Sequence, residues 1–354
     1  MDDPVSLDLM FKQANAAQRA GAWSEAERRY RALTRLKPLW AYHNLGVCYV
    51  ATGRFKEAEA AFRAALEVDP TCAPPRHSLG MLLLADGRYA EGWPLNEARR
   101  EIPGLQIALP NLPYPEWQGE ELRGKRLLVV GEQGLGDQIQ FARLLPQLVV
   151  RGAHVTFACA PSLVSLFGGL GVDLLAQTPG CELPPADYWT LICSMPLHMR
   201  LTVETIPGQP YLVAAPSRPP GGVGVVDRGS PTHLNDRFRS LGPQAAAQLL
   251  AMGESLAPEV TGAADFQQTA EIVAGLDLVI SVDTSVAHLA GAMGKPVWIL
   301  LPAAETDWRW LRGRTDSPWY PSAKLYRQQV PGKWAPVLRQ VAADLESLGL
   351  RAGA

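Results

Sequence analysis

The sequence lacks an excess of charge of either sign, because 33 Lys and Arg residues stand against 35 Asp and Glu residues and leave a formal net charge of -2. No global electrostatic field would therefore draw the chain onto nucleic acid or an anionic membrane. It also lacks a run near the roughly 18 apolar residues that a membrane-spanning helix needs. Its acidic start, MDDPVSLDLMFKQ, is unlike a secretory signal. We expect a cytoplasmic protein with no nucleic-acid partner and no membrane span.

Paired cysteines are missing as well. The cysteines are odd in number, widely scattered and without a CxxC pair: Cys48, Cys72, Cys159, Cys181 and Cys193. This usage argues against a disulfide framework, a zinc knuckle and a thioredoxin-like site, and it is typical of reduced cytosolic thiols. What the chain does have is 354 residues with a hydrophobic content of 47%, enough for two or three packed domains.

The N-terminal part of the chain contains an internal repeat. Equivalent residues recur at spacings of 34 and 32, with Leu45, Gly46 and Gly53 returning as Leu79, Gly80 and Gly87, and with Gly21, Ala26 and Pro38 returning as Gly53, Ala58 and Pro70. A period of this length predicts stacked helical hairpins. Small residues at Gly46 and Ala58 would let two antiparallel helices approach each other closely.

The middle copy, from Tyr42 to Pro70, resembles the tetratricopeptide repeat, and the copies on either side follow the pattern less closely. Such arrays commonly offer a concave surface to an extended peptide or a partner helix. The alternative is that this array packs on a neighbouring domain or dimerises, and the sequence does not separate the two. We assign residues 1–101 to the helical domain, followed by a Pro-rich connector from Ile102 to Glu121.

A different pattern begins at Arg126, where short apolar runs alternate with helical stretches. The runs RLLVV, HVTFACA and YWTLICS predict strands of a parallel sheet with crossover helices, among them FARLLPQLVV and a helix near Leu163. A second series, with the strands VGVV, LVISV and VWILL, follows a Pro-rich break. The last helical stretch, Lys333 to Leu348, is expected to cross back onto the first series.

The sequence therefore predicts an α/β fold with an all-α N-terminal part. Its α/β region consists of two Rossmann-like halves in tandem, the first over residues 102–215 and the second over residues 216–354. The carboxyl ends of both sheets would face a shared cleft, where ligands bind in folds of this kind.

A glycine-rich turn, GEQGLGD, follows the first of these strands. Its glycines, Gly131, Gly134 and Gly136, stand in the order GxxGxG and not in the GxGxxG order of dinucleotide-binding folds, and no Gly-Lys-Ser/Thr sequence follows a strand. The turn thus argues against a dehydrogenase and against a P-loop ATPase. It brings backbone close to a ligand and places Asp137 in the first turn of a helix. There the carboxylate serves as a helix cap, as a catalytic base, or as both.

A second turn, in ISVDTSVAHLAGAMGKPVW, follows the strand from Leu278 to Val282. Asp283, Thr284 and Ser285 lead from this strand into a helix that carries His288. Free amides, hydroxyl groups and the positive end of the helix dipole suit a pyrophosphate at this helix start. His288 lies near the same face, where it either contacts the ligand or packs within the domain.

Two further stretches carry candidate ligand contacts. In NDRFRS, Asn235 precedes Arg237 and Arg239, which either contact phosphate or belong to a solvated surface loop. In TDWRWLRGRTDSPWYP, which has little periodicity, Trp308 and its aromatic neighbours either stack on a base or sugar or pin the loop onto the sheet.

Together these motifs resemble a known family. GEQGLGDQIQFARLLPQL, NDRFRSL, LVISVDTSVAHLAGAMGKPVWILLP and DWRWLRGRTDSPWYPSAKLYRQ resemble bacterial tetratricopeptide proteins whose C-terminal part is a GT-B glycosyltransferase, related to the heptosyltransferases. The resemblance covers nearly the whole chain. The heptosyltransferase fingerprint falls on Asp137 in the first turn and on Asp283, Thr284 and His288 in the second. Ser285 replaces a Gly that many heptosyltransferases carry.

The resemblance implies a metal-independent, inverting glycosyltransferase that uses a nucleotide sugar as donor and needs no cofactor. Asp137 would be the catalytic base that takes the proton of the acceptor hydroxyl. The implied nucleotide-sugar contacts are Gly134, Gly136, Asn235, Arg237, Arg239, Asp283, Thr284, Ser285, His288 and Trp308.

The acceptor implied by the repeat is a polypeptide or another large molecule. The alternative function is a catalytically inactive scaffold, or an adaptor that binds a sugar nucleotide and uses the repeat for protein interaction. What supports this alternative is the segment from Leu241 to Asp265, which shows no clear apolar strand where relatives have one.

Overall fold

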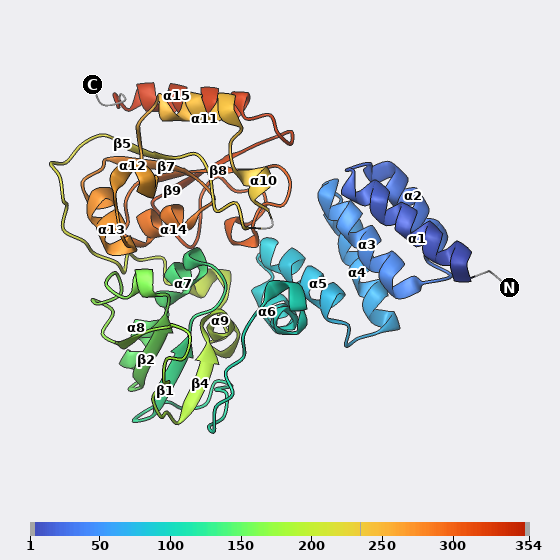
Figure 1. The fold of residues 1–354 in the computed structure, drawn as a ribbon, viewed down its shortest axis with the longest axis horizontal. Helices are drawn as coiled ribbons and strands as arrows, with labels where there is room; N and C mark the ends of the chain where they lie inside the picture. The colour runs from blue at the N-terminus through green and yellow to red at the C-terminus, as the bar shows by residue number, and fades with distance from the viewer. Residues whose placement is uncertain (1–3, 234, 351–354) are drawn as a thin grey trace. The chain divides into compact units, whose positions relative to one another are not determined.

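The computed structural model describes residues 4–233 and 235–350, so the first three residues of the acidic start lie outside the described part. The chain divides into two compact units, with the boundary between Leu109 and Pro110. The first unit is helical and the second contains two parallel sheets, which confirms the predicted fold class (Figure 1). Among the described residues, no helix combines the length and the apolar character that crossing a membrane requires.

The first unit consists of three helical hairpins. They are formed by α1 (Pro4–Arg19) with α2 (Trp23–Leu33), α3 (Pro38–Ala51) with α4 (Phe55–Val68), and α5 (Ala73–Ala85) with α6 (Tyr89–Asn96), followed by the 3-10 helices η1 (Glu97–Glu101) and η2 (Pro103–Leu105). Each hairpin turns at a glycine with positive φ, namely Gly21, Gly53 and Gly87. The repeat predicted from the glycine spacing therefore corresponds to the helical hairpins of the structure.

The close approach expected inside the middle hairpin is present. A Cβ added at Gly46 would lie only 2.3 Å from the Phe62 ring, so the two helices meet where the side chain is missing. Tyr49, Ala58 and Phe62 are buried in the shared helical core. Burial of this face, more than helix propensity, is what stabilises helices of this length.

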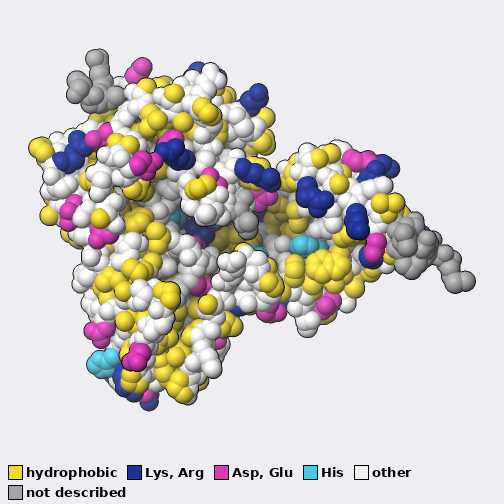
Figure 2. All heavy atoms as spheres, in the orientation of Figure 1, with side chains coloured by type: hydrophobic (Ala, Val, Ile, Leu, Met, Phe, Trp, Pro, Cys, Tyr) yellow, Lys and Arg dark blue, Asp and Glu magenta, His cyan; other side chains and the backbone are white. Residues whose placement is uncertain are grey.

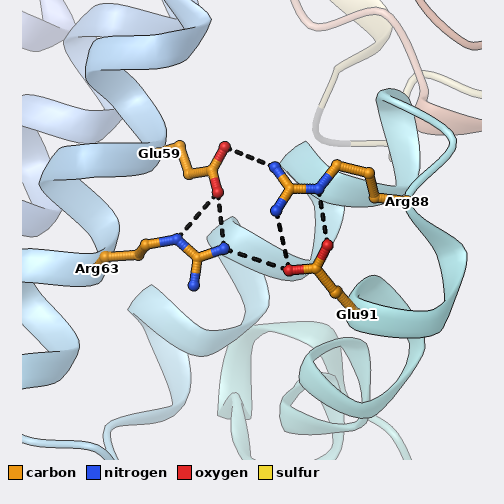
Figure 3. Close-up of polar contacts among 4 residues, drawn as sticks. All are labelled: Glu59, Arg63, Arg88 and Glu91. Atoms are coloured by element: carbon orange, nitrogen blue, oxygen red, sulfur yellow. Dashed lines mark hydrogen bonds and ion pairs between the residues drawn. The ribbon is translucent and has the colours of Figure 1, made fainter.

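Neighbouring hairpins are joined by the same set of ion pairs twice. Glu59 of α4 accepts from Arg63 at 2.7 Å and from Arg88 at 2.8 Å, and Arg88 also pairs with Glu91 of α6 (Figure 3). One hairpin earlier, Glu27 pairs with Arg31 and Arg54, and Arg54 pairs with Glu57 in the same pattern. These pairs bridge successive second helices of the hairpins and help to fix their register.

The first half of the second unit is a four-stranded parallel sheet in the order β3-β2-β1-β4. Its strands are β1 (Arg126–Val130), β2 (His154–Cys159), β3 (Asp173–Ala176) and β4 (Tyr188–Leu191), and its helices include α7 (Leu135–Ala142), α8 (Leu145–Val150) and the short α9 (Met195–His198). The helix expected near Leu163 is only a 3-10 turn, η3 (Pro161–Leu163). Strand β3 was not predicted, because DLLA is short and lies at the sheet edge.

The second half is a five-stranded parallel sheet in the order β6-β5-β7-β8-β9. Its strands are β5 (Val223–Val226), β6 (Glu254–Ser255), β7 (Leu278–Val282), β8 (Val297–Leu301) and β9 (Ala323–Arg327), and its helices are α10 (Asp236–Arg239), α11 (Pro243–Leu250), α12 (Pro258–Thr261), α13 (Phe266–Ala274), α14 (Ser285–Ala292) and α15 (Ala335–Ser347). A strand thus exists between Leu241 and Asp265, where none was clear. This strand has two residues, which pair with Gly224 and Val225. Because both of its residues are polar, the sequence shows no apolar run there.

The C-terminal helix corrects one expectation. Instead of crossing to the first half, α15 lies over its own sheet, with Val337, Leu338, Val341 and Leu345 in one core with residues of β5, β7 and β8. Figure 1 shows it beside α11 on one face of this sheet. The apolar face of α15 finds its partner there, so burial holds the helix on the second half.

Candidate active site

The two predicted turns lie at equivalent places in the two halves. Helix α7 begins after β1 of the first sheet, and α14 begins after β7 of the second. The two helices lie beside each other where the halves meet (Figure 1). Gly136 in the first turn of α7 packs against His288 of α14, since a Cβ at Gly136 would lie 2.8 Å from the His288 ring. The structure therefore brings together the two motifs that the sequence singled out.

Asp137 is the third residue of α7 and is engaged through both carboxylate oxygens. Its Oδ2 atom accepts a hydrogen bond from the backbone N–H of Gly134, at 2.9 Å, so it closes the helix start whose N-cap is Gly134. Its Oδ1 atom contacts the guanidinium of Arg309. Its side chain is 16% exposed. The capping role considered for Asp137 is confirmed, and its role as a base stays a prediction.

Arg309 is the residue that sequence reasoning missed. It lies in the 3-10 helix η6 (Trp308–Trp310) of the second half, and its side chain is 9% exposed. It donates to Asp137 and Gln140 of α7 and to Asp307 at 2.8 Å. Burial opposes its charge, but Asp137 and Asp307 hold the pKa of Arg309 above its ordinary value. Arg309 stands between two tryptophans in the sequence, but no local pattern there records its contact with Asp137.

The turn before α14 holds a second carboxylate in an unusual state. Burial, together with the nearby Asp307 carboxylate, raises the pKa of Asp283 to about 7. Thr284 is the N-cap of α14, and its hydroxyl lies 3.0 Å from the Ser281 hydroxyl. Ser285 is the first residue of the helix. The first-turn amides of a helix have no partner inside it, so this helix start suits an anionic group.

His288 is buried, with 5% exposure, and its surroundings are aromatic. Its Nδ1 atom lies 2.9 Å from the Tyr320 hydroxyl, and its ring stacks on Trp310 with centroids 5.3 Å apart. Burial lowers the pKa of His288 well below its ordinary value, and the charges of Arg309 and Arg143 act in the same direction. The imidazole is therefore neutral. Packing accounts for its present contacts, and a ligand role stays a prediction.

The NDRFRS stretch reaches the same turn through one of its arginines. Arg239 donates to the backbone carbonyl of Asp283 at 2.8 Å and pairs with Asp236 at 3.2 Å. Arg237 is exposed, with its guanidinium over the Phe238 ring. Asn235 precedes α10 as its N-cap residue. Of the two arginines, Arg239 is the one placed beside the helix start.

The aromatic stretch is pinned down by its own side chains. Trp308 is 4% exposed, packs edge-on against Trp319, and carries the Arg309 guanidinium over its ring at 4.7 Å. Trp310, Trp319 and Tyr320 are buried as well. The loop-pinning alternative for Trp308 thus describes its contacts, and stacking on a base or sugar stays a prediction. A cavity of about 440 Å³, between β9 and α15, contains none of the predicted site residues.

Comparison with known proteins supports this assignment of the two units. Residues 39–72 match the model of the tetratricopeptide repeat, and residues 241–310 match that of glycosyltransferase family 9 (heptosyltransferase). Protein FlbA of Caulobacter vibrioides is 29% identical over 371 residues, which cover 86% of this chain and 61% of FlbA. The chain thus spans less than two thirds of the length of this relative.

The solved structures to which the chain is similar include a chaperone and a transferase. The type III secretion translocator chaperone SycD of Yersinia enterocolitica matches with a TM-score of 0.27 and 19% identity, over 29% of this chain and 82% of that chain. A mutant O-GlcNAc transferase of Thermobaculum terrenum matches with a TM-score of 0.28 and 15% identity, over 99% of this chain and 92% of that chain. The family matches agree with the resemblance drawn from the sequence: a segment of the first unit is similar to the tetratricopeptide repeat, and a segment of the second unit is similar to glycosyltransferase family 9.

Proposed function

We propose that the protein is a metal-independent, inverting glycosyltransferase that moves a sugar from a nucleotide sugar to a polypeptide or other large acceptor in the cytoplasm. The observation that carries this proposal is the meeting of the two turns. A carboxylate of the first half, Asp137, lies on α7, which packs at Gly136 against the first turn of α14. A base from one half and an anion-binding helix start from the other are what transfer from a nucleotide sugar requires.

The positive groups of the site support binding of the donor without a metal. The start of α14 presents the positive end of the helix dipole, and Arg239 adds a guanidinium beside Asp283. Together they would neutralise the diphosphate and stabilise the charge that develops on it as the bond to the sugar breaks. The carboxyl of Asp283 lies in the turn before α14. Protonation of this carboxyl on donor binding would remove a negative charge that repels the diphosphate.

A second function, the inactive adaptor, is favoured by two observations. Both oxygens of Asp137 are already engaged, one by the Gly134 amide and one by Arg309. Strand β6 is reduced to Glu254–Ser255. An adaptor would keep the helix start of α14 and bind a sugar nucleotide without turning it over.

Calorimetric titration with UDP, GDP, ADP and CMP, with and without magnesium, tests the site directly. We expect one of the four to bind with a dissociation constant between about 1 μM and 1 mM, independently of magnesium. Hydrolysis of the matching sugar nucleotide then separates an enzyme from an adaptor. No heat and no thermal shift with any of the four would remove both the transferase and the adaptor that binds a sugar nucleotide, and would leave a scaffold.

A further inference from the structure

Arg309 joins the two halves at the predicted base. It comes from η6 of the second half and reaches across to α7 of the first half, where it donates to Asp137 and to the side-chain oxygen of Gln140. Its third partner, Asp307, belongs to its own half and lies 2.8 Å away. The guanidinium also lies over two rings, 4.7 Å from the centroid of Trp308 and 5.8 Å from that of Phe141.

Such a contact meets two needs of a catalytic carboxylate in a buried site. The carboxylate has to be ionised before it takes a proton, although burial disfavours the charge, and a guanidinium beside it offsets this cost. It also has to point at the acceptor within hydrogen-bond reach. Arg309 acts on both, because its planar fork, fixed by Asp307 and Gln140, leaves the Asp137 carboxylate little freedom to turn.

Resting on the glycosyltransferase function proposed above, we propose that Arg309 is the positioning residue of Asp137, holding its carboxylate aimed between the two halves. In the transfer step the acceptor oxygen forms a bond to the anomeric carbon, the bond from that carbon to the diphosphate oxygen breaks, and the acceptor proton passes to Asp137. Asp137 becomes neutral at that moment. Arg309 stays paired, because Asp307 still faces it.

The other charged and titratable groups around this pair do not replace Arg309. Asp283 and Asp307 bring negative charge toward it, and His288 is neutral because of burial and the nearby arginines, which lower its pKa. His233 lies near Asp137, but burial and Arg239 lower the pKa of this imidazole as well. Cys193 faces Arg309. Of these groups, Arg309 is the cation in hydrogen-bond contact with Asp137.

The chain offers a matched control for the loop that carries Arg309. Arg327 of β9 donates to the backbone carbonyls of Trp310, Leu311 and Arg314, so it fastens the same loop without touching Asp137. Arg309→Met removes the positioning contact, Arg309→Lys keeps a cation, and Arg327→Met removes only support of the loop. Each full-length variant is assayed for release of nucleoside diphosphate from UDP-N-acetylglucosamine, GDP-mannose and ADP-glucose.

We expect Arg309→Met to lower kcat by about 100-fold, the smaller end of what a general base contributes, with KM for the sugar nucleotide within about threefold. Arg309→Lys should restore at least about a tenth of the native kcat. Arg327→Met should lower the melting temperature and keep kcat within about twofold.

The outcomes separate the two proposals. Equal losses of kcat in Arg309→Met and Arg327→Met would show that Arg309 only supports the loop, and the transferase function would stand. A rise in KM alone would place Arg309 in donor binding and overturn the positioning role. A native chain that releases no nucleoside diphosphate from any of the three donors would count against the transferase function itself, and the positioning role would fall with it.

Discussion

Gly136 lies directly against the imidazole of His288, since a Cβ added to this glycine would come within 2.8 Å of the ring carbon Cδ2 and 3.6 Å of the Ser285 Cα. The two residues belong to different halves of the second unit. The ring cannot retreat easily, because Trp310 stacks on it and Tyr320 holds its Nδ1 atom. The distance between α7 and α14 thus depends on the absence of a side chain at Gly136.

Gly136→Ala should therefore be destabilising although it is a small change within a helix. Overpacking of this kind costs about 1 to 3 kcal/mol, and thermal unfolding should report a melting temperature several degrees lower. The control is Gly134→Ala, whose added Cβ would meet only the Asp137 Oδ2 atom, at 3.2 Å. Equal melting temperatures for the two variants would show that α7 and α14 can move apart to accept a Cβ at Gly136 without loss of stability.

Asp137→Asn should abolish transfer and leave nucleoside diphosphate affinity within about threefold of the native value, because an amide oxygen can still accept from Gly134 but cannot take a proton. A loss of kcat of about 100-fold or more is expected. The measurement is steady-state kinetics together with calorimetric titration of the same preparation. Full activity in this variant would take Asp137 out of the mechanism.

Arg239→Ala should weaken nucleoside diphosphate binding by about tenfold, the effect of losing one charge-assisted contact. This arginine also holds the Asp283 carbonyl, so its loss loosens the turn before α14. Arg228→Ala is the control, because Arg228 is exposed and, within the described part of the chain, pairs with Glu259. If calorimetric titration gives the same dissociation constant for both variants, Arg239 does not contact the nucleoside diphosphate.

Much of the fold could be predicted because its signals are local. Glycine spacing gives the hairpins, and the apolar runs at β1, β2, β5, β7 and β8 are long enough to be recognised as buried strands. The missed strands are β3, which is short and only half-buried, β6, which has two polar residues, and β9, whose sequence AKLYR carries two charged residues. At such edges the neighbouring strand decides the pairing, and local sequence says little.

Some residues of the candidate site could likewise be predicted from local sequence, and others could not. Asp137 and the Asp283 to Ser285 turn could be found because each follows a strand and begins a helix, a place where ligands bind in open α/β sheets. Arg309 could not, because its partner Asp137 lies 172 residues away in the sequence and no local pattern records that contact. For the same reason the burial of Trp308 was open until the packing of Trp319 was known.

Asp283 should make the stability of the protein depend on pH. Its pKa is raised from 3.8 to about 7 by burial and by Asp307, so the folded state binds this proton more tightly than the unfolded state. The folded state therefore loses stability as the pH rises above the pKa of Asp283 in the unfolded chain. The loss is complete once the pH exceeds the pKa of Asp283 in the folded protein. Asp283→Asn removes this loss of stability. Its gain in unfolding free energy should be larger near pH 8 than near pH 5 by about 2 kcal/mol.

Urea unfolding at the two pH values measures this difference. The sign is the test, because a carboxyl that is stabilised as an anion would give the opposite result, with Asp283→Asn losing more stability at the higher pH. The same gain at both pH values would mean that Asp283 titrates as an ordinary carboxyl.

Removal of the first unit should affect transfer to the acceptor but not binding of the nucleotide. The boundary between Leu109 and Pro110 leaves the second unit with both sheets and all its predicted site residues, so residues 110–354 should fold alone and bind nucleoside diphosphate with an affinity within about threefold of the full chain. If the repeat presents a polypeptide acceptor, transfer to that acceptor should fall at least about tenfold, whereas hydrolysis of the sugar nucleotide should persist. Kinetics of both reactions on the two chains decide the matter. Equal loss of transfer and hydrolysis in a fragment that still melts cooperatively would show that the repeat supports the second unit structurally and does not recruit the acceptor.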